Sequence, residues 1–357
     1  MKLSSLSQAT AVITLDADLT AASEEPLNEY VASAAQQGMK KVVLDFRPVD
    51  HMNSGAAGVL VKLTTVAKPR GVRLMAYGLG QRYREIMALT NLDQGISVLS
   101  DNPDQALLSS DELAELQKMD AKAGRQSDAG WAPLVEKLHV TERPEGAFAR
   151  NMDGRRLLGQ LKGFGPMWEK LYWLNITKPG IKKDDVLQAM AAHFVEFQPK
   201  ENFFYPTSQG IAPGQMIFID SHTPGGIVST GVMVLYMDDR SFSFITPQGH
   251  PEAGWITFSV DEKPDSVYVQ IQGLVRASYP FFEVAFTIAG SKFQETIWKH
   301  VLGSLAEYLG VENNVQMTKY RPAVDLQWGR WGNIWYNSQL RSLPLNITAL
   351  FRRSNRS

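Results

Sequence analysis

Apolar and polar residues follow two alternating patterns in the first third of the chain. Three short apolar runs have the length of strands, and amphipathic patterns with apolar residues three and four positions apart separate them. The strand patterns cover residues 12–15, 41–46 and 72–77, and the helical patterns cover residues 24–37 and 54–67. Strands separated by single helices indicate βαβ units, so we predict a small α/β domain over residues 1–110.

The second half of the chain has a different pattern. Residues 216–286 read as consecutive strands, in which Val267, Val269 and Ile271 alternate with Tyr and Gln side chains. Residues 291–309 carry apolar side chains at a spacing of four, which predicts a long helix that ends before Gly310. A run of strands followed by a long helix predicts an α+β domain over residues 161–311, with an antiparallel sheet folded around that helix.

Two segments lack these patterns. Residues 111–160 are rich in charged residues with scattered Gly, Ser and Pro, so we predict a charged linker. Within it, residues 111–119 read as a helix that could end the first domain, and the rest reads as exposed. Residues 312–357 form an aromatic and basic C-terminal extension with 7 basic and 2 acidic side chains. Basic residues among tryptophans can bind anionic lipid headgroups, which makes membrane contact through this extension one possibility. The other is that the extension packs on its own domain.

The composition excludes several classes of function. With 36 basic and 37 acidic side chains the formal net charge is -1, which removes the broad positive field of a nucleic-acid-binding protein. The absence of cysteine excludes disulfides and thiolate chemistry and fits a reducing cytoplasm. No apolar run approaches the length of a membrane span, and no secretory leader is visible. The histidines and carboxylates show no metal-binding spacing, so we predict neither a metal nor another cofactor.

The turn that leads into the helix at residues 54–67 contains the first candidate site. Asn53-Ser54-Gly55 joins a buried strand to a helix N-terminus, where free backbone N–H groups and the helix dipole favour a phosphate group. The small residues at positions 55–58 would leave the approach to Ser54 open to a partner. The alternative is that Asn53 or Ser54 is an ordinary helix cap.

This strand, turn and helix resemble the STAS domain of anti-sigma-factor antagonists over about residues 5–108. The resemblance implies phosphorylation of Ser54 by a partner kinase, and binding of that kinase or a related anti-sigma-like regulator by the unphosphorylated form. Members that are phosphorylated often carry Asp-Ser-Ser-Gly, whereas this chain has Asn53-Ser54-Gly55-Ala56. The added charge of a phosphate would repel an acidic or apolar partner.

A long helix across a curved antiparallel sheet usually leaves a cavity between them, so we predict an apolar ligand pocket in the second domain. Packing as an ordinary core is the alternative for each of these side chains. The candidate lining residues are Phe218, Met233, Leu235, Phe244, Trp255, Phe258 and Val269 on strands, and Phe293, Ile297 and Val301 on the helix.

A Gly-His-Pro-Glu motif between two of the strands carries a second resemblance. Gly249-His250-Pro251-Glu252 is similar to the hallmark of an uncharacterised bacterial and plant domain family, whose fold is like the START and polyketide-cyclase helix-grip architecture. The likeness covers about residues 168–310 and implies a hydrophobic pocket. His250 and Glu252 could act as an acid–base pair, or they could form a hydrogen-bonded structural turn.

We therefore expect a cytoplasmic bacterial regulatory protein. In this hypothesis a STAS-like module docks onto a partner protein or switches by phosphorylation, and a helix-grip domain binds an apolar small molecule or lipid. A coupling of the two binding events would require that the ligand prefer one arrangement of the chain. The alternatives are a cyclase- or hydrolase-like enzyme that uses His250 and Glu252, and an accessory protein of lipid trafficking.

Overall fold

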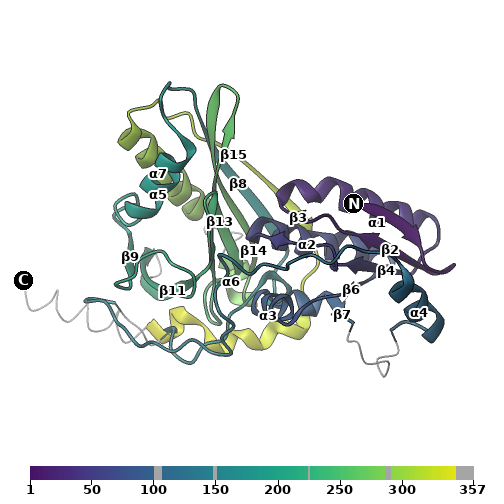
Figure 1. Ribbon diagram of the computed structural model, residues 1–357. Helices are drawn as coiled ribbons and strands as arrows, with labels where there is room; N and C mark the ends of the chain where they lie inside the picture. Colours follow the sequence, from purple (N-terminus) through teal and green to yellow (C-terminus); the bar gives the residue numbers. More distant parts are fainter. Residues whose placement is uncertain (100–106, 148–150, 224–225, 286–290, 343–357) are drawn as a thin grey trace, which may run out of the picture. The chain divides into compact units, whose positions relative to one another are not determined.

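The computed structural model describes residues 1–99, 107–147, 151–223, 226–285 and 291–342. The chain divides into two compact units, Met1–Leu134 and Val135–Ser357 (Figure 1). This boundary falls inside the segment that we expected to be a linker. Each unit has its own sheet, and the two are described separately.

The first unit is built on a five-stranded sheet of order β1-β2-β4-β6-β7. Four strands are parallel: β2 (Thr10–Thr14), β4 (Lys41–Asp45), β6 (Arg73–Tyr77) and β7 (Ile96–Val98). β1 (Lys2–Ser5) pairs with β2 in the antiparallel direction at one edge. Helices α1 (Glu24–Gln36), α2 (Ser54–Ala67) and α3 (Gln81–Thr90) connect the parallel strands. The α/β fold predicted for the N-terminal part is therefore confirmed.

Both faces of this sheet are covered. Three side chains that lie opposite one another on neighbouring strands, Val12, Val43 and Met75, pack with Leu116 of α4 (Ser110–Lys118). Their neighbours along the strands are equally buried and face the opposite side, because successive side chains of a strand alternate. Residues beyond position 110 thus complete the core of the first unit.

The second unit contains an eight-stranded antiparallel sheet of order β15-β8-β14-β13-β12-β11-β10-β9. Its strands are β8 (Met167–Ile176), β9 (Asn202–Pro206), β10 (Met216–Thr223), β11 (Gly226–Met237), β12 (Ser241–Ile245), β13 (Glu252–Lys263), β14 (Ser266–Ala277) and β15 (Gln316–Ala323). The helices are α5 (Lys183–Ala192), α6 (Pro280–Ala285) and α7 (Ser291–Leu309). The expected antiparallel sheet and long helix are both present, and α7 has the bounds predicted from its spacing.

Helices α5 and α7 lie on one face of the sheet (Figure 1). This helix-facing core contains Leu187 of α5, Val301 of α7 and strand residues such as Phe258. Burial of large apolar side chains between a helix and a sheet supplies the main stabilisation of such a unit.

Residues 151–160, which precede the sheet in the sequence, pack against its other face. Leu158 N donates to Thr246 O at 2.9 Å, and Gln160 Nε2 donates to Leu274 O at 2.7 Å. Asn151 Nδ2 donates to Ser229 O at 2.7 Å. Met152, Leu157 and Leu158 are buried. Residues 151–160, which we assigned to an exposed linker, are therefore part of the second unit, because hydrogen bonds to the backbone of distant residues anchor them.

Candidate functional site

The N-terminus of α2 is the first candidate site. Asn53 is the helix cap, since its Oδ1 accepts a hydrogen bond from Ala56 N at 3.0 Å. Just before it, β5 (His51–Met52) pairs in parallel with β3 (Asp18–Leu19) and holds the turn. Ser54 is the first residue of the helix, and its exposed fraction is 0%.

The expectation of an open approach to Ser54 is therefore wrong. Ala56 and Ala57 are also buried, whereas Gly55 is half-buried and lies close to Ala21. Because Asn53 is the cap, Ser54 is the first residue inside the helix. Its side chain packs within the unit. The exposed part of this corner consists of Ala21, Ala22 and the partly exposed Asn53 and Gly55.

A segment that the sequence analysis missed lies along the loop before Ser54. This flanking segment, residues 124–131, forms three backbone hydrogen bonds with residues 47–50 and a parallel bridge between His51 and Ser127. The indole of Trp131 donates to Met52 O at 2.7 Å. The backbone bonds run from Gly124 N to Arg47 O at 2.6 Å, from Gln126 N to Val49 O at 3.1 Å and from Ser127 N to Asp50 O at 2.7 Å.

Gly124 and Gln126 hold the flanking segment close to the loop. A Cβ atom at Gly124 would lie 2.2 Å from Val49 O, so glycine is required for this approach. The Gln126 amide donates to Phe46 O at 3.1 Å and Gly78 O at 2.6 Å, and its Oε1 accepts from Gly80 N at 2.6 Å. The buried Trp131 was the one local signal of packing in this stretch of charged residues.

The expected pocket residues of the second unit form packed layers. Phe244, Phe258, Val269, Ile297 and Val301 belong to the helix-facing core. The rings of Phe194, Phe242, Phe244 and Phe258 contact one another with centroids 4.7 to 6.0 Å apart. The side chains of these strands therefore pack against each other and against α5.

Four other expected residues are buried outside the helix-facing core. Phe218 lies between Ile217 and Ile219, and Met233 lies between Val232 and Val234, all four of which belong to the helix-facing core. Because strand side chains alternate, Phe218 and Met233 point away from α7, and Trp255 does the same. Leu235 is buried where the pairing of β11 with β12 is irregular. The side chain of Phe293 lies outside the described residues.

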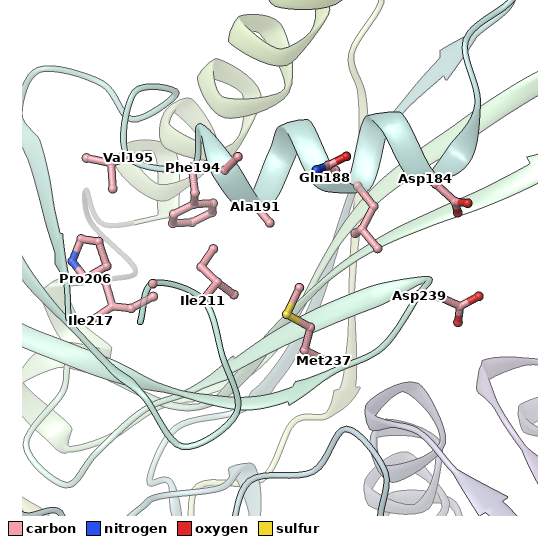
Figure 2. Close-up of a pocket in the computed structure, with 13 residues that line it drawn as sticks. Asp184, Gln188, Ala191, Phe194, Val195, Pro206, Ile211, Ile217, Met237 and Asp239 are labelled. Atoms are coloured by element: carbon pink, nitrogen blue, oxygen red, sulfur yellow. The ribbon is translucent and has the colours of Figure 1, made fainter. Parts of the chain in front are cut away.

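A pocket lies elsewhere, between α5 and strands β9 to β11. Its volume is about 580 Å³, within the range of small-molecule sites. Figure 2 shows Ala191 and Phe194 opposite Ile211, Ile217 and Met237. Asp184 and Asp239 also line it, and Lys183 Nζ lies 3.0 Å from Asp239 Oδ2. None of the nine described candidates from the sequence lines this pocket, because sheet face and helix placement decide which side chains reach it.

His250 and Glu252 contact each other through the backbone. The Nδ1 atom of His250 lies 3.0 Å from both the nitrogen and the carbonyl oxygen of Glu252. Burial lowers the pKa of His250 to about 4, so the imidazole is neutral at pH 7. The Glu252 carboxylate accepts from Gln294 Nε2 at 2.7 Å, and burial raises its pKa. This geometry agrees with a hydrogen-bonded turn and offers no direct proton transfer between the two side chains.

The C-terminal extension divides into two parts within the described residues. β15 adds a strand to the sheet beside β8. Trp328, Trp331 and Trp335 are then exposed, at 67%, 57% and 73%. The ring centroids of Trp328 and Phe164 lie 5.3 Å apart. The last 15 residues lie outside the described part of the chain.

The described residues include no cluster of three or more potential metal ligands. Among the helices of those same residues, none is long and apolar enough to span a membrane.

Known proteins are similar to parts of this chain. Residues 6–106 match the family model of the STAS domain. No curated protein matches the chain. Among solved structures, the unphosphorylated anti-sigma factor antagonist SpoIIAA is 15% identical, with 33% of this chain and 98% of that chain covered and a TM-score of 0.25. SpoIIAA, a Bacillus cell fate determinant, also matches in its phosphorylated form, at 16% identity over 28% of this chain and 91% of that chain, with a TM-score of 0.23.

One further match is the di-domain aromatase/cyclase StfQ of the steffimycin biosynthetic pathway. It is 12% identical over 41% of this chain and 53% of that chain, with a TM-score of 0.32. The parallel sheet, its connecting helices and the family match over residues 6–106 together identify the N-terminal part of this chain as a STAS domain.

Proposed function

We propose that this protein is a regulatory binding protein whose STAS domain docks onto a partner protein and whose second unit binds an apolar ligand. The STAS domain over residues 6–106 is the observation that carries the docking role. The partner class is a regulatory kinase or an anti-sigma-like protein, as the sequence resemblance implies.

The corner at the N-terminus of α2 is the proposed docking surface. Ala21 and Ala22 are exposed beside the partly exposed Asn53 and Gly55, and side chains this small let a partner backbone approach closely. Phosphorylation of Ser54 is the second part of the proposal. Because the Ser54 side chain is buried, a kinase could reach its hydroxyl only after the N-terminus of α2 opens locally.

Arginine substitutions test the docking surface. The chain purified from its own host is analysed by native mass spectrometry for a bound protein and for phosphate on Ser54. Ala22→Arg should abolish retention of the bound protein, because a long charged side chain blocks the corner. Gln36→Arg, at the exposed end of α1, is the control and should retain it. Equal retention by both variants would reject this surface.

The ligand role rests on the pocket between α5 and β9 to β11. Its mostly apolar lining and volume of about 580 Å³ suit an apolar small molecule or lipid tail. A single antiparallel sheet with α7 along one face also agrees with the helix-grip architecture.

Filling the pocket tests the ligand role. Ala191→Phe should eliminate any lipid that co-purifies in native mass spectra, since the ring would occupy the pocket. Asp185→Phe, on the same helix but outside the lining, should retain the lipid. If the wild-type spectrum contains no added mass, the ligand role is rejected.

The presence of both roles in one chain motivates a coupling between them. The co-purified ligand should change the affinity of the full chain for its partner, because a ligand that prefers one arrangement shifts the population toward it. Identical partner affinity before and after removal of the ligand would contradict the coupling.

A further inference from the structure

Three of the eight tryptophans of this chain are exposed on one short helix of the second unit. This helix, η7 (Trp328–Tyr336), is a 3-10 helix that presents Trp328, Trp331 and Trp335, each more than half exposed. Residues three positions apart share a face of such a helix, so Trp328 and Trp331 point to the same side. The other five tryptophans of the chain are buried or half-buried.

Helix α6 lies against η7 and extends this apolar surface. Its Phe281 and Val284 are also more than half exposed. We call Phe281, Val284 and the three tryptophans of η7 the aromatic patch. Single exposed apolar side chains are common on proteins, but several that lie together indicate a surface that binds a partner.

Hydrogen bonds on the inner side of η7 hold it in this orientation. Asn333 Nδ2 donates to Lys162 O at 3.0 Å and to Ser278 O at 2.9 Å. Directly after the helix, the Tyr279 hydroxyl donates to Asn337 Oδ1 at 3.0 Å. Polar side chains of this segment thus face the protein and the tryptophans face outward, which is the reverse of an ordinary surface helix. The exposure of the tryptophans is therefore a feature of the folded unit.

The charge of the same stretch of chain is positive. From residue 326 to the end, the sequence contains five arginines and no Asp or Glu, whereas the whole chain has a net charge of -1. The acidic residues near η7 interact with other arginines: Asp325 Oδ1 lies 3.6 Å from Arg276 Nη2, and Arg321 acts on Glu283 of α6. The tryptophans thus lie in a segment whose charge complements an anionic surface.

The residue types of the patch favour a membrane over a protein as the partner. Tryptophan has an apolar ring and a polar N–H group, so it is most stable where hydrocarbon meets the lipid headgroups. Arginine binds phosphate through several N–H donors, and phosphate is the charged group of anionic phospholipids. No helix of the described residues can span a bilayer, so the contact expected here is one at the membrane surface.

We propose that the aromatic patch docks this protein onto the surface of an anionic lipid membrane. The indoles enter the headgroup region, while the positive charge of residues 326–357 attracts the lipid phosphates. Neither the corner at the N-terminus of α2 nor the pocket under α5 includes any residue of the patch. The proposal therefore does not depend on either part of the proposed function.

Vesicle flotation with the full chain tests the docking. Vesicles of equal amounts of phosphatidylglycerol and phosphatidylcholine should carry the protein upward, and vesicles of phosphatidylcholine alone should bind it about tenfold more weakly or less. Trp331→Ala combined with Trp335→Ala should lower the affinity for the anionic vesicles by about tenfold or more, because two large apolar side chains leave the interface. Brominated phosphatidylcholine in the same vesicles should quench tryptophan fluorescence in the wild type and quench it much less in the double variant.

Tyr308→Ala is the matched control, because Tyr308 is an exposed aromatic residue at the opposite end of β8. It precedes Leu309, whose carbonyl oxygen accepts from Lys178 Nζ after the end of β8, whereas Gln327 N donates to Phe164 O before its start. This variant should float like the wild type. The double variant should keep the melting temperature of the wild type, since both of its indoles are exposed.

Three results would overturn the proposal. The first is a wild-type protein that does not float with the anionic vesicles. The second is a double variant that floats as well as the wild type and is quenched equally. The third is a wild-type dimer that ignores vesicles and that the double variant separates into monomers in analytical ultracentrifugation, which would assign the patch to a contact between two copies of the chain.

Discussion

Glu112 of α4 binds four groups of the first unit through its side chain. Its carboxylate accepts from Thr10 Oγ1 at 2.5 Å, Ser7 Oγ at 2.8 Å, the Ser109 backbone at 2.9 Å and Lys41 at 3.3 Å. Burial opposes ionisation, but these donors outweigh it and lower the pKa of Glu112 to about 2. Since the ordinary value is 4.5, the ionised side chain stabilises the folded state at neutral pH.

Glu112→Gln should therefore lower the free energy of unfolding at pH 7 by about 2–3 kcal/mol. A carboxylate whose pKa is lower in the folded state stabilises that state fully at pH values above its unfolded-state pKa. This stabilisation is lost as the pH falls through the folded-state pKa. The difference in free energy of unfolding between the wild type and the variant should shrink from pH 4.5 toward pH 2. Urea unfolding at several pH values measures this difference. Glu115→Gln, an exposed position on the same helix, should show no such trend.

Ser54 gives a second prediction at the scale of one residue. Ser54→Asp should lower the free energy of unfolding by about 2 kcal/mol or more, because a carboxylate would be buried even though the helix dipole favours it. Ser54→Ala should cost about 1 kcal/mol, the value of one hydrogen bond. Thermal unfolding followed by circular dichroism compares the two. An aspartate variant as stable as the alanine variant would show that the side chain reaches solvent.

The flanking segment is an element whose position depends on one glycine. Gly124→Val should detach residues 124–131 from the loop at residues 47–50, because the side chain would overlap Val49 O. Amide hydrogen exchange at Gln126 and Ser127 should then accelerate about tenfold or more, as their backbone bonds are lost. The neighbouring exposed residue offers a control, Ala123→Val, for which exchange should remain slow.

The elements themselves differ in how far local sequence determined them. The spacing of apolar residues in α7 and the continuous apolar run of β4 predicted both elements nearly to their ends, because these signals depend on residues that are close in sequence. β15 and the flanking segment were missed. Each is stabilised by pairing with a distant segment and carries few apolar side chains of its own.

At the scale of the whole molecule, the unit boundary can be tested by truncation. A fragment of residues 1–134 should unfold cooperatively, because it contains α4 and the flanking segment. A fragment of residues 1–110 should have a lower melting temperature, since it exposes Val12, Val43 and Met75 to water. Equal melting temperatures in calorimetry would support the boundary at residue 110 that the sequence analysis predicted.

The sequence by itself determined the main α/β alternation of the first unit and the antiparallel sheet with its long helix in the second, because periodicity and turn residues act over short distances. The STAS domain followed from the resemblance around Asn53-Ser54-Gly55. Tertiary structure decided that Ser54 is buried, that Phe218 and Met233 face away from α7, and that Lys170 and Glu252 meet the two ends of Gln294. These features depend on which face of a strand is covered and on which distant segments pair. Both follow from the packing of the entire unit, and no short stretch of sequence encodes them.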